Sequence, residues 1–151
     1  MNKKQIITAA VLIHKNDKVL VGKRADSKSF LPGKWELPGG HIEFGETIIE
    51  GILREVKEEF QIDIVLDDPY FEYSYVMENG EEHVVEIIYF GRIKNSKQQL
   101  KINEKDHSEY KWISKNEVNK YFADNKYEGN AIKRGFELLE NLTSKNIYEN
   151  D

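Results

Sequence analysis

The chain contains no cysteine among its 151 residues. This absence excludes a disulfide framework, a zinc site built on thiolates and a thiol nucleophile. The chain also lacks any apolar run close to the roughly 20 residues that a membrane-spanning helix needs. From its length and composition we expect one globular domain, located in the cytoplasm and without a membrane partner.

The apolar run at residues 6–13 follows two lysines and so imitates the start of a signal peptide. The run is short, contains Thr8, and continues into the polar stretch 14–18 without a cleavage site of small residues. A secretory signal needs such a site. We therefore interpret this segment as a buried strand.

The chain has fewer positively than negatively charged side chains. It contains 22 Lys and Arg and 27 Asp and Glu, which gives a net charge of −5. General nucleic-acid binding depends on Lys and Arg side chains that neutralise phosphates. We therefore expect no nucleic-acid partner. A small phosphorylated ligand held by a few local cations is compatible with this charge.

The apolar pattern predicts several short strands and two longer helices. Strands are expected at residues 6–13, 19–21, 35–37, 62–66, 71–77, 84–93 and 110–113. Helices are expected at 47–60 and 128–142, with a third beginning after Ser114, which forms a capping-box pattern with Glu117. Strands and helices that mix in this way are typical of an α/β domain with a mixed sheet. We expect residues 1–143 to form this domain and residues 144–151 to be a frayed polar tail.

The helix predicted at residues 47–60 carries three glutamates on one side. Each helical residue advances by about 100°, so Glu55, Glu58 and Glu59 are neighbours on the helix surface. Their repulsion could be offset by Arg54 or by a hard divalent cation. From this helix alone, a solvated acidic face and a metal site both stay open. The apolar stripe that we expect to face the core on another side consists of Ile49, Ile52, Leu53, Val56 and Phe60.

The residues before this helix extend the pattern. Gly40 is followed by five residues and Glu46, and then by seven residues and the run Arg54-Glu55-Val56-Lys57-Glu58-Glu59-Phe60-Gln61-Ile62. This stretch resembles the Nudix box of the Nudix hydrolases, and eight of the nine fixed places of the box match. Residues 33–40 are similar to the approach to the box in MutT-like members. The departure is Gln61, where the family usually has a glycine. A left-handed backbone at this helix end would cost Gln61 about 1–2 kcal/mol.

The resemblance implies an α/β/α sandwich, with a mixed β-sheet and helices on both faces. It also implies that water attacks one phosphorus of a small-molecule nucleoside diphosphate derivative and breaks a phosphoanhydride bond. Arg54 and Glu46 are then a structural pair that orients the acids. Because Nudix domains are often dimers, a homodimer is a further expectation. The resemblance assigns Mg²⁺, with Mn²⁺ as the alternative, to Glu55, Glu58, Glu59 and the carbonyl of Gly40.

Members of the family differ in the acid that serves as general base. Glu55 and Glu58 are the candidates inside the box. The loop before the last strand offers Glu104, Asp106 and Glu109, of which Asp106 has the best spacing for a further metal ligand. A solvated polar loop explains these three acids equally well.

Residues outside the box bear on the substrate. Arg24 follows the second strand and is a candidate phosphate contact, with a surface position as the alternative. Asn130 lies where MutT-like proteins place an asparagine that reads the base; a polar residue at a helix start is the rival interpretation. Phe30 and Trp35 could stack on a base, although core packing also explains Trp35.

Signatures of the family branches that act on ADP-ribose, diadenosine polyphosphates and coenzyme A are absent. The resulting prediction is hydrolysis of a nucleoside triphosphate to the monophosphate and pyrophosphate. The alternatives are hydrolysis of a nucleotide-sugar or ADP-ribose-type diphosphate, and a non-catalytic domain that senses a nucleotide.

Overall fold

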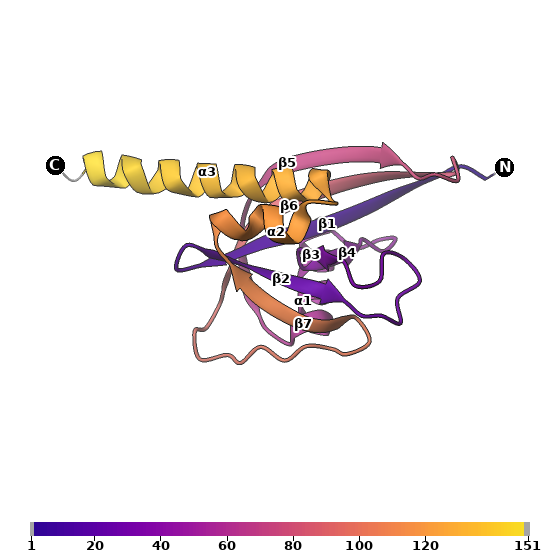
Figure 1. Cartoon of the computed structure of the whole chain (residues 1–151), viewed down its shortest axis with the longest axis horizontal. Coiled ribbons are helices and arrows are strands. Elements are labelled where there is room, and N and C mark those ends of the chain that lie inside the picture. Colours follow the sequence, from indigo (N-terminus) through magenta and orange to yellow (C-terminus); the bar gives the residue numbers. More distant parts are fainter. Residues whose placement is uncertain (1, 150–151) are drawn as a thin grey trace.

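The computed structural model describes residues 2–149, and side chains as far as residue 144. The helices are α1 (Ile48–Phe60), α2 (Val118–Phe122) and α3 (Lys126–Glu149), with one 3₁₀ turn at Lys115–Glu117. The strands are β1 (Lys4–Lys15), β2 (Lys18–Arg24), β3 (Trp35–Glu36), β4 (Gly39–His41), β5 (Ile64–Val76), β6 (Glu82–Ile93) and β7 (His107–Ile113). They form one mixed sheet, with α1 toward one side and α2 and α3 toward the other (Figure 1).

β1 organises the sheet. The strand order is β3-β2-β1-β6-β5, with β4 paired to β1 and β7 paired to β2. β1 runs parallel to β6 and antiparallel to β2 and β4. Because successive side chains of a strand point to opposite faces, β1 supplies two separate cores. Ala10 and Leu12 pack with α2 and α3, whereas Ala9, Val11 and Ile13 pack with α1.

The expected α/β architecture with helices on both faces of a mixed sheet is confirmed. The two strands predicted at residues 62–66 and 71–77 are one strand, β5, whose register shifts on both sides of Pro69. Proline cannot donate to a ladder and is accommodated at such irregularities. None of the described helices is long and apolar enough to cross a membrane.

The C-terminal end of the last helix was predicted wrongly. α3 continues to Glu149, through most of the stretch expected to be a frayed tail. The helix could not be predicted in that stretch from its polar composition, because Ser, Lys and Asn residues do not form the apolar face by which a helix is recognised. Asn150 and Asp151 lie outside the described residues.

The apolar face of α1 is narrower than predicted. Ile52, Val56 and Phe60 are fully buried, whereas Ile49 and Leu53 remain 51% and 39% exposed. α1 packs on β1 and β4 along a narrow strip, so the residues on either side of this strip remain partly exposed to solvent. Glu59 occupies a place in this strip and is buried, so the three acids do not all face away from the core.

Candidate active site

The N-terminal end of α1 is fixed by a reciprocal pair of hydrogen bonds. The Thr47 side chain accepts from the Glu50 backbone N–H at 3.1 Å, and the Glu50 carboxylate accepts from the Thr47 N–H at 2.9 Å. This capping box satisfies two backbone donors near the helix end. The helix therefore starts at Ile48, which sets the direction in which the following turns present their side chains.

Arg54 joins α1 to the loop before it. Its guanidinium donates to the two Glu46 oxygens at 2.7 and 3.1 Å, and to the His41 carbonyl at 3.1 Å. Bidentate charge-assisted pairs are strong and directional, and this one lowers the pKa of Glu46. Gly51 leaves room for it, because a Cβ there would lie 2.9 Å from a Glu46 oxygen. The structure thus brings together the two residues expected to pair.

The same guanidinium reaches two acids of the predicted metal site. Nη1 of Arg54 donates to Glu55 at 2.9 Å and to Glu58 at 3.3 Å. The cation offsets part of the repulsion between these neighbouring carboxylates. The Glu58 side chain is half-exposed, whereas that of Glu55 is mostly shielded. Arg54 therefore holds a partly shielded and an exposed acid in one cluster.

Two adjacent glycines let β4 approach both β1 and α1. Gly39 has a φ of +148°, and a Cβ there would lie 2.1 Å from the Ala9 carbonyl oxygen. Gly40 faces the helix, where a Cβ would lie 2.6 Å from the carboxyl carbon of Glu55. Glycine alone fits both positions without displacing a neighbour. The backbone of Gly40 and the carboxylate of Glu55 therefore lie close together, as a shared cation requires.

Glu59 is the buried member of the acidic cluster, with 4% of its surface exposed. It accepts a hydrogen bond from the Gly39 N–H at 3.0 Å. Burial raises the pKa of Glu59 well above its usual value, and the charges of Glu36 and Glu55 add to this effect. A divalent cation would compensate this negative charge, and oxygen donors of this kind suit a hard ion. The residues present therefore fit a metal site.

Asp106 is the loop acid that acts on this cluster. Its negative charge contributes to the raised pKa of Glu59, and its carboxylate forms an ion pair with Lys28 at 2.8 Å. Glu104 and Glu109, the other two acids considered from the sequence, are exposed. Of these three acids, Asp106 is thus the one whose charge acts on Glu59, and its role as a metal ligand stays a prediction.

His107 belongs to the site but was not found from the sequence. Its ring is fully buried, stacks on Phe60 at 5.1 Å between centroids, and lies beside Gly22, where a Cβ would be 2.6 Å from the ring. Nε2 lies 2.9 Å from a Glu36 oxygen and 3.4 Å from a Glu59 oxygen. Ligand atoms of these three residues all lie within 4.8 Å of one another, close enough to hold a metal ion. No periodic pattern marks His107, because the next four residues of β7 are exposed.

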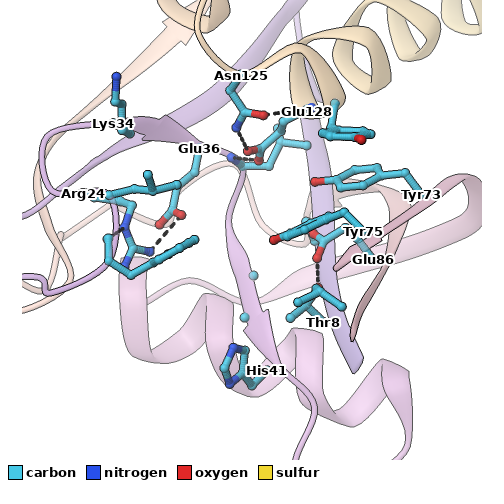
Figure 2. A pocket seen from close by; sticks show the side chains of 18 of the residues that line it. Thr8, Arg24, Lys34, Glu36, His41, Tyr73, Tyr75, Glu86, Asn125 and Glu128 are labelled. Atoms are coloured by element: carbon cyan, nitrogen blue, oxygen red, sulfur yellow. Dashed lines mark hydrogen bonds and ion pairs between the residues drawn. The ribbon is translucent and has the colours of Figure 1, made fainter. Parts of the chain in front are cut away.

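A cavity of about 590 Å³ extends from Gly40 on β4 to Asn125 before α3 (Figure 2). Its size suits a small-molecule ligand. Arg24, the predicted phosphate contact, lines this cavity and forms an ion pair with Glu36 at 3.1 Å. Phe30 and Trp35 line it as well, so all three of these residues lie where a ligand could reach them.

Asn130 does not lie in this cavity. It is exposed on α3, because Glu128, Ala131 and Ile132 are the positions of the helix that face inward. Asn125, which precedes the helix, lines the cavity instead and donates to Glu128 at 3.0 Å. The structure therefore gives no support to the prediction that the Asn130 side chain contacts the base of a nucleotide.

Glu86 on β6 and Glu128 on α3 also line the cavity, and neither was predicted from the sequence. Each interrupts an apolar pattern. Glu86 is the one acid within the run 84–90, and Glu128 shares the inward stripe of α3 with Ala131 and Ile132. Acids are rarely buried without a partner. An acid at an otherwise apolar position was therefore the signal that could have found both.

Comparison with known proteins agrees with this geometry. A family model described as the NUDIX domain matches residues 3–134. The nucleoside triphosphatase NudI of Escherichia coli O139:H28 (strain E24377A / ETEC) is 29% identical over 118 residues, which cover 73% of this chain and 82% of the relative. Several other curated relatives, by contrast, are matched over less than two thirds of their own length. One is the 8-oxo-dGTP diphosphatase of Proteus vulgaris, which is 42% identical over 65 residues, or 42% of this chain and 57% of the relative.

The fold is shared with a solved structure, that of the MutT protein from Methanosarcina mazei Go1. The two chains are 27% identical with a TM-score of 0.77, and the match covers 93% of this chain and 98% of the other. The similarity therefore extends well beyond the stretch from Gly40 to Ile62. Since the NUDIX model spans most of the sequence and α1 sets its acids against Gly40 and Arg54 as the Nudix box requires, the chain belongs to the NUDIX domain family.

Proposed function

We propose that this protein is a Mg²⁺-dependent Nudix hydrolase that cleaves a nucleoside triphosphate into the monophosphate and pyrophosphate. The observation that carries the proposal is the acidic cluster of α1, set against Gly40 at one end of the cavity. The names of two relatives, a nucleoside triphosphatase and an 8-oxo-dGTP diphosphatase, support a triphosphate substrate.

The metal would be held by Glu55, Glu58, Glu59 and the Gly40 carbonyl, with Asp106 as a further ligand from the loop. When bound, Mg²⁺ or Mn²⁺ neutralises phosphate oxygens and lowers the pKa of the attacking water. Two observations support this ligand set. Its donors are all oxygens, and burial beside other acids raises the pKa of Glu59, as expected where negative charge lacks a counter-ion.

The remaining residues have distinct roles in the proposed reaction. The oxygen of water bonds to one phosphorus, the bridging P–O bond breaks, and the pyrophosphate leaves. The proton of the water passes to a carboxylate, for which Glu55 and Glu58 are the candidates. Arg54 and Glu46 keep these acids in place. Arg24, on the cavity wall, is proposed to donate to a phosphate oxygen in exchange for its contact with Glu36.

The test is hydrolysis of a panel of dNTPs, oxidised dGTP, ADP-ribose and sugar nucleotides in the presence of Mg²⁺, followed as pyrophosphate or phosphate released from the triphosphates and as nucleoside monophosphate released from ADP-ribose and the sugar nucleotides. We expect turnover of at least one triphosphate, no turnover in EDTA, and recovery with Mg²⁺ or Mn²⁺. Glu58→Gln should lower kcat by about 10²- to 10⁴-fold, the range for loss of a proton-transfer group. Glu137→Gln, an exposed acid of α3, serves as the matched control and should retain full activity.

The same panel separates the alternatives. Turnover of ADP-ribose or a sugar nucleotide, with all triphosphates untouched, would replace the proposed substrate class but keep the hydrolase. No turnover of any compound, with Glu58→Gln indistinguishable from the wild type, would leave a nucleotide-sensing domain. The homodimer and the cytoplasmic location stay predictions; sedimentation analysis tests the first and cell fractionation the second.

A further inference from the structure

The ring of His107 reaches across β2 to meet Glu36. β2 pairs with β7, which carries His107, and also with β3, in which Glu36 is the partner of Gly22. The ring lies over Gly22, where a Cβ would be 2.6 Å from Cδ2 and 2.9 Å from Nε2. Because Gly22 has no side chain, a residue of one neighbouring strand can contact a residue of the other.

His107 lies between two carboxylates that have different further partners. Its Nε2 is 2.9 Å from Glu36 Oε1 and 3.4 Å from Glu59 Oε2. The other oxygen of Glu36 accepts from Arg24 Nη1 at 3.1 Å (Figure 2), and the other oxygen of Glu59 accepts from the Gly39 N–H at 3.0 Å. Each of the four carboxylate oxygens thus has a polar neighbour. The contacts run without a break from Arg24 on the cavity wall to the buried acid of α1.

The surroundings of the His107 ring decide which nitrogen carries its proton. Nδ1 is buried and has no hydrogen-bond partner in the described part of the chain, whereas Nε2 faces the two carboxylates. A proton on Nδ1 would be a buried donor without an acceptor, and the bare Nε2 would then face Glu36 and Glu59 as a third acceptor. The proton therefore resides on Nε2. A metal ion on Nε2 would need the opposite arrangement, so the ring is better suited to orient a metal ligand than to be one.

We propose that His107 is a positioning residue for the metal site, whose Nε2–H orients the carboxylate of Glu59 and, through Glu36, holds Arg24 on the cavity wall. The inference rests on the proposed function, because it concerns how Glu59 is presented to the metal. Hydrogen bonds from neighbouring groups fix the orientation of metal-binding carboxylates. Gly39 holds one oxygen of Glu59, and His107 restrains the other.

Manganese binding tests this role without turnover. Mn²⁺ is titrated into the substrate-free protein, and electron paramagnetic resonance of the free ion gives the dissociation constant. His107→Met and His107→Gln form a matched pair, because their side chains have similar size and only glutamine offers an N–H at a similar reach. We expect His107→Met to raise Kd by about 10- to 100-fold, the range for loss of a group that orients a metal ligand. His107→Gln should recover most of this loss.

Two further variants sharpen the test. Gly22→Ala keeps the imidazole but displaces its Nε2 edge, and should weaken Mn²⁺ binding in the same direction as His107→Met. His83→Met is the control, because His83 on β6 lies beside Gln5 and should keep the wild-type Kd. The titration gives the number of sites and the dissociation constant separately. A partly unfolded sample therefore lowers the first and leaves the second unchanged.

The outcomes separate this inference from the proposed function. Weaker Mn²⁺ binding in His107→Met, with recovery in His107→Gln, supports the inference even if no triphosphate is hydrolysed. A wild-type Kd in both His107→Met and Gly22→Ala overturns it even if the chain is an active hydrolase. Equal weakening in the methionine and glutamine variants also overturns it, because the packing of the ring and not its N–H would then be the cause. Absence of Mn²⁺ binding by the wild type overturns it as well.

Discussion

At the scale of single residues, Gly39 and Gly40 are both required to be glycine, but for different reasons. At Gly39 the space of a Cβ is taken by the backbone of β1, which cannot move without disturbing the sheet. At Gly40 the space is taken by the carboxyl of Glu55, the far end of a flexible side chain. The first glycine therefore maintains the fold, and the second maintains the position of a candidate metal ligand.

We therefore expect alanine at Gly39 to affect mainly stability and alanine at Gly40 to affect mainly activity. Gly39→Ala should lower the free energy of unfolding by more than about 2 kcal/mol, because it combines overpacking with an unfavourable φ. Gly40→Ala should leave the urea midpoint nearly unchanged but lower the hydrolysis rate by about 100-fold, since small displacements of catalytic groups have effects of that order. Urea unfolding and pyrophosphate release measure the two effects. Equal loss of stability in both variants would contradict this division.

Single residues were the hardest level to predict from the sequence. The box pattern identified Gly40, Glu46, Arg54 and the three acids, because their spacing along one helix and its approach is itself the signal. His107, by contrast, reaches the site through β7, which pairs with β2 far from it in the sequence. No local pattern records that pairing. Asn130 was chosen from its position along the chain, whereas only the fold decides that this residue lies on the exposed face of α3 and outside the cavity.

At the scale of elements, the two ends of α1 differ in how favourably they are capped. The N-terminal end has a complete capping box. The C-terminal end is closed by Gln61 in the left-handed conformation, with φ 56° and ψ 35°, and its N–H donates to the Lys57 carbonyl at 3.0 Å. The left-handed helix end that the resemblance implies is therefore present, although the residue that usually provides it is not.

Gln61→Gly should stabilise the protein. Relief of the left-handed strain contributes about 1–2 kcal/mol, and the greater freedom of glycine in the unfolded chain offsets about 0.4–1 kcal/mol of this. Chemical denaturation should therefore show a net gain. Gln99→Gly is the control, because Gln99 is exposed and is not among the described residues with a positive φ; it should be neutral or destabilising. A loss of stability in Gln61→Gly would mean that the glutamine side chain has a role of its own.

Most elements could be predicted because the apolar periods of their residues are local. The failures share one cause. β5 was divided in two at Pro69, and α3 was ended early, because local composition indicated a break that the pairing with β6 or the continuing helix overrides. Ile49 and Leu53 have helical spacing, but only contact with β1 and β4 decides which apolar residues of α1 become core.

At the scale of the whole molecule, buried acids on the cavity side make stability depend on pH. The folded-state pKa of Glu128 is about 8, compared with an ordinary value of 4.5. Between these values the folded protein keeps a proton that the unfolded chain releases. Stability from this group is therefore fully present below about pH 4.5 and falls as pH rises toward 8. Glu86 acts in the same direction.

Glu128→Gln should flatten this dependence. For one such group, the free energy of unfolding falls by at most about 1.4 kcal/mol for each pH unit within the window. Urea unfolding of the wild type and the variant at pH 5, 6, 7 and 8 gives the two slopes. The slope of the variant should be shallower. Parallel slopes would show that Glu128 ionises in the folded protein as it does in water.

The two faces of β1 belong to different parts of the molecule, the cavity on one side and the core beneath α1 on the other. Thr8 and Ala10 line the cavity, whereas Ala9 and Val11 face the core beneath α1. Substitutions on the cavity side can thus change the surface offered to a ligand while the packing under the acidic helix stays intact. Under the proposed function, a lineage of such chains would exchange its substrates and retain its chemistry, and a directed-evolution library confined to the cavity-facing positions of β1, β5 and β6 would explore new substrates at little risk to the acidic helix.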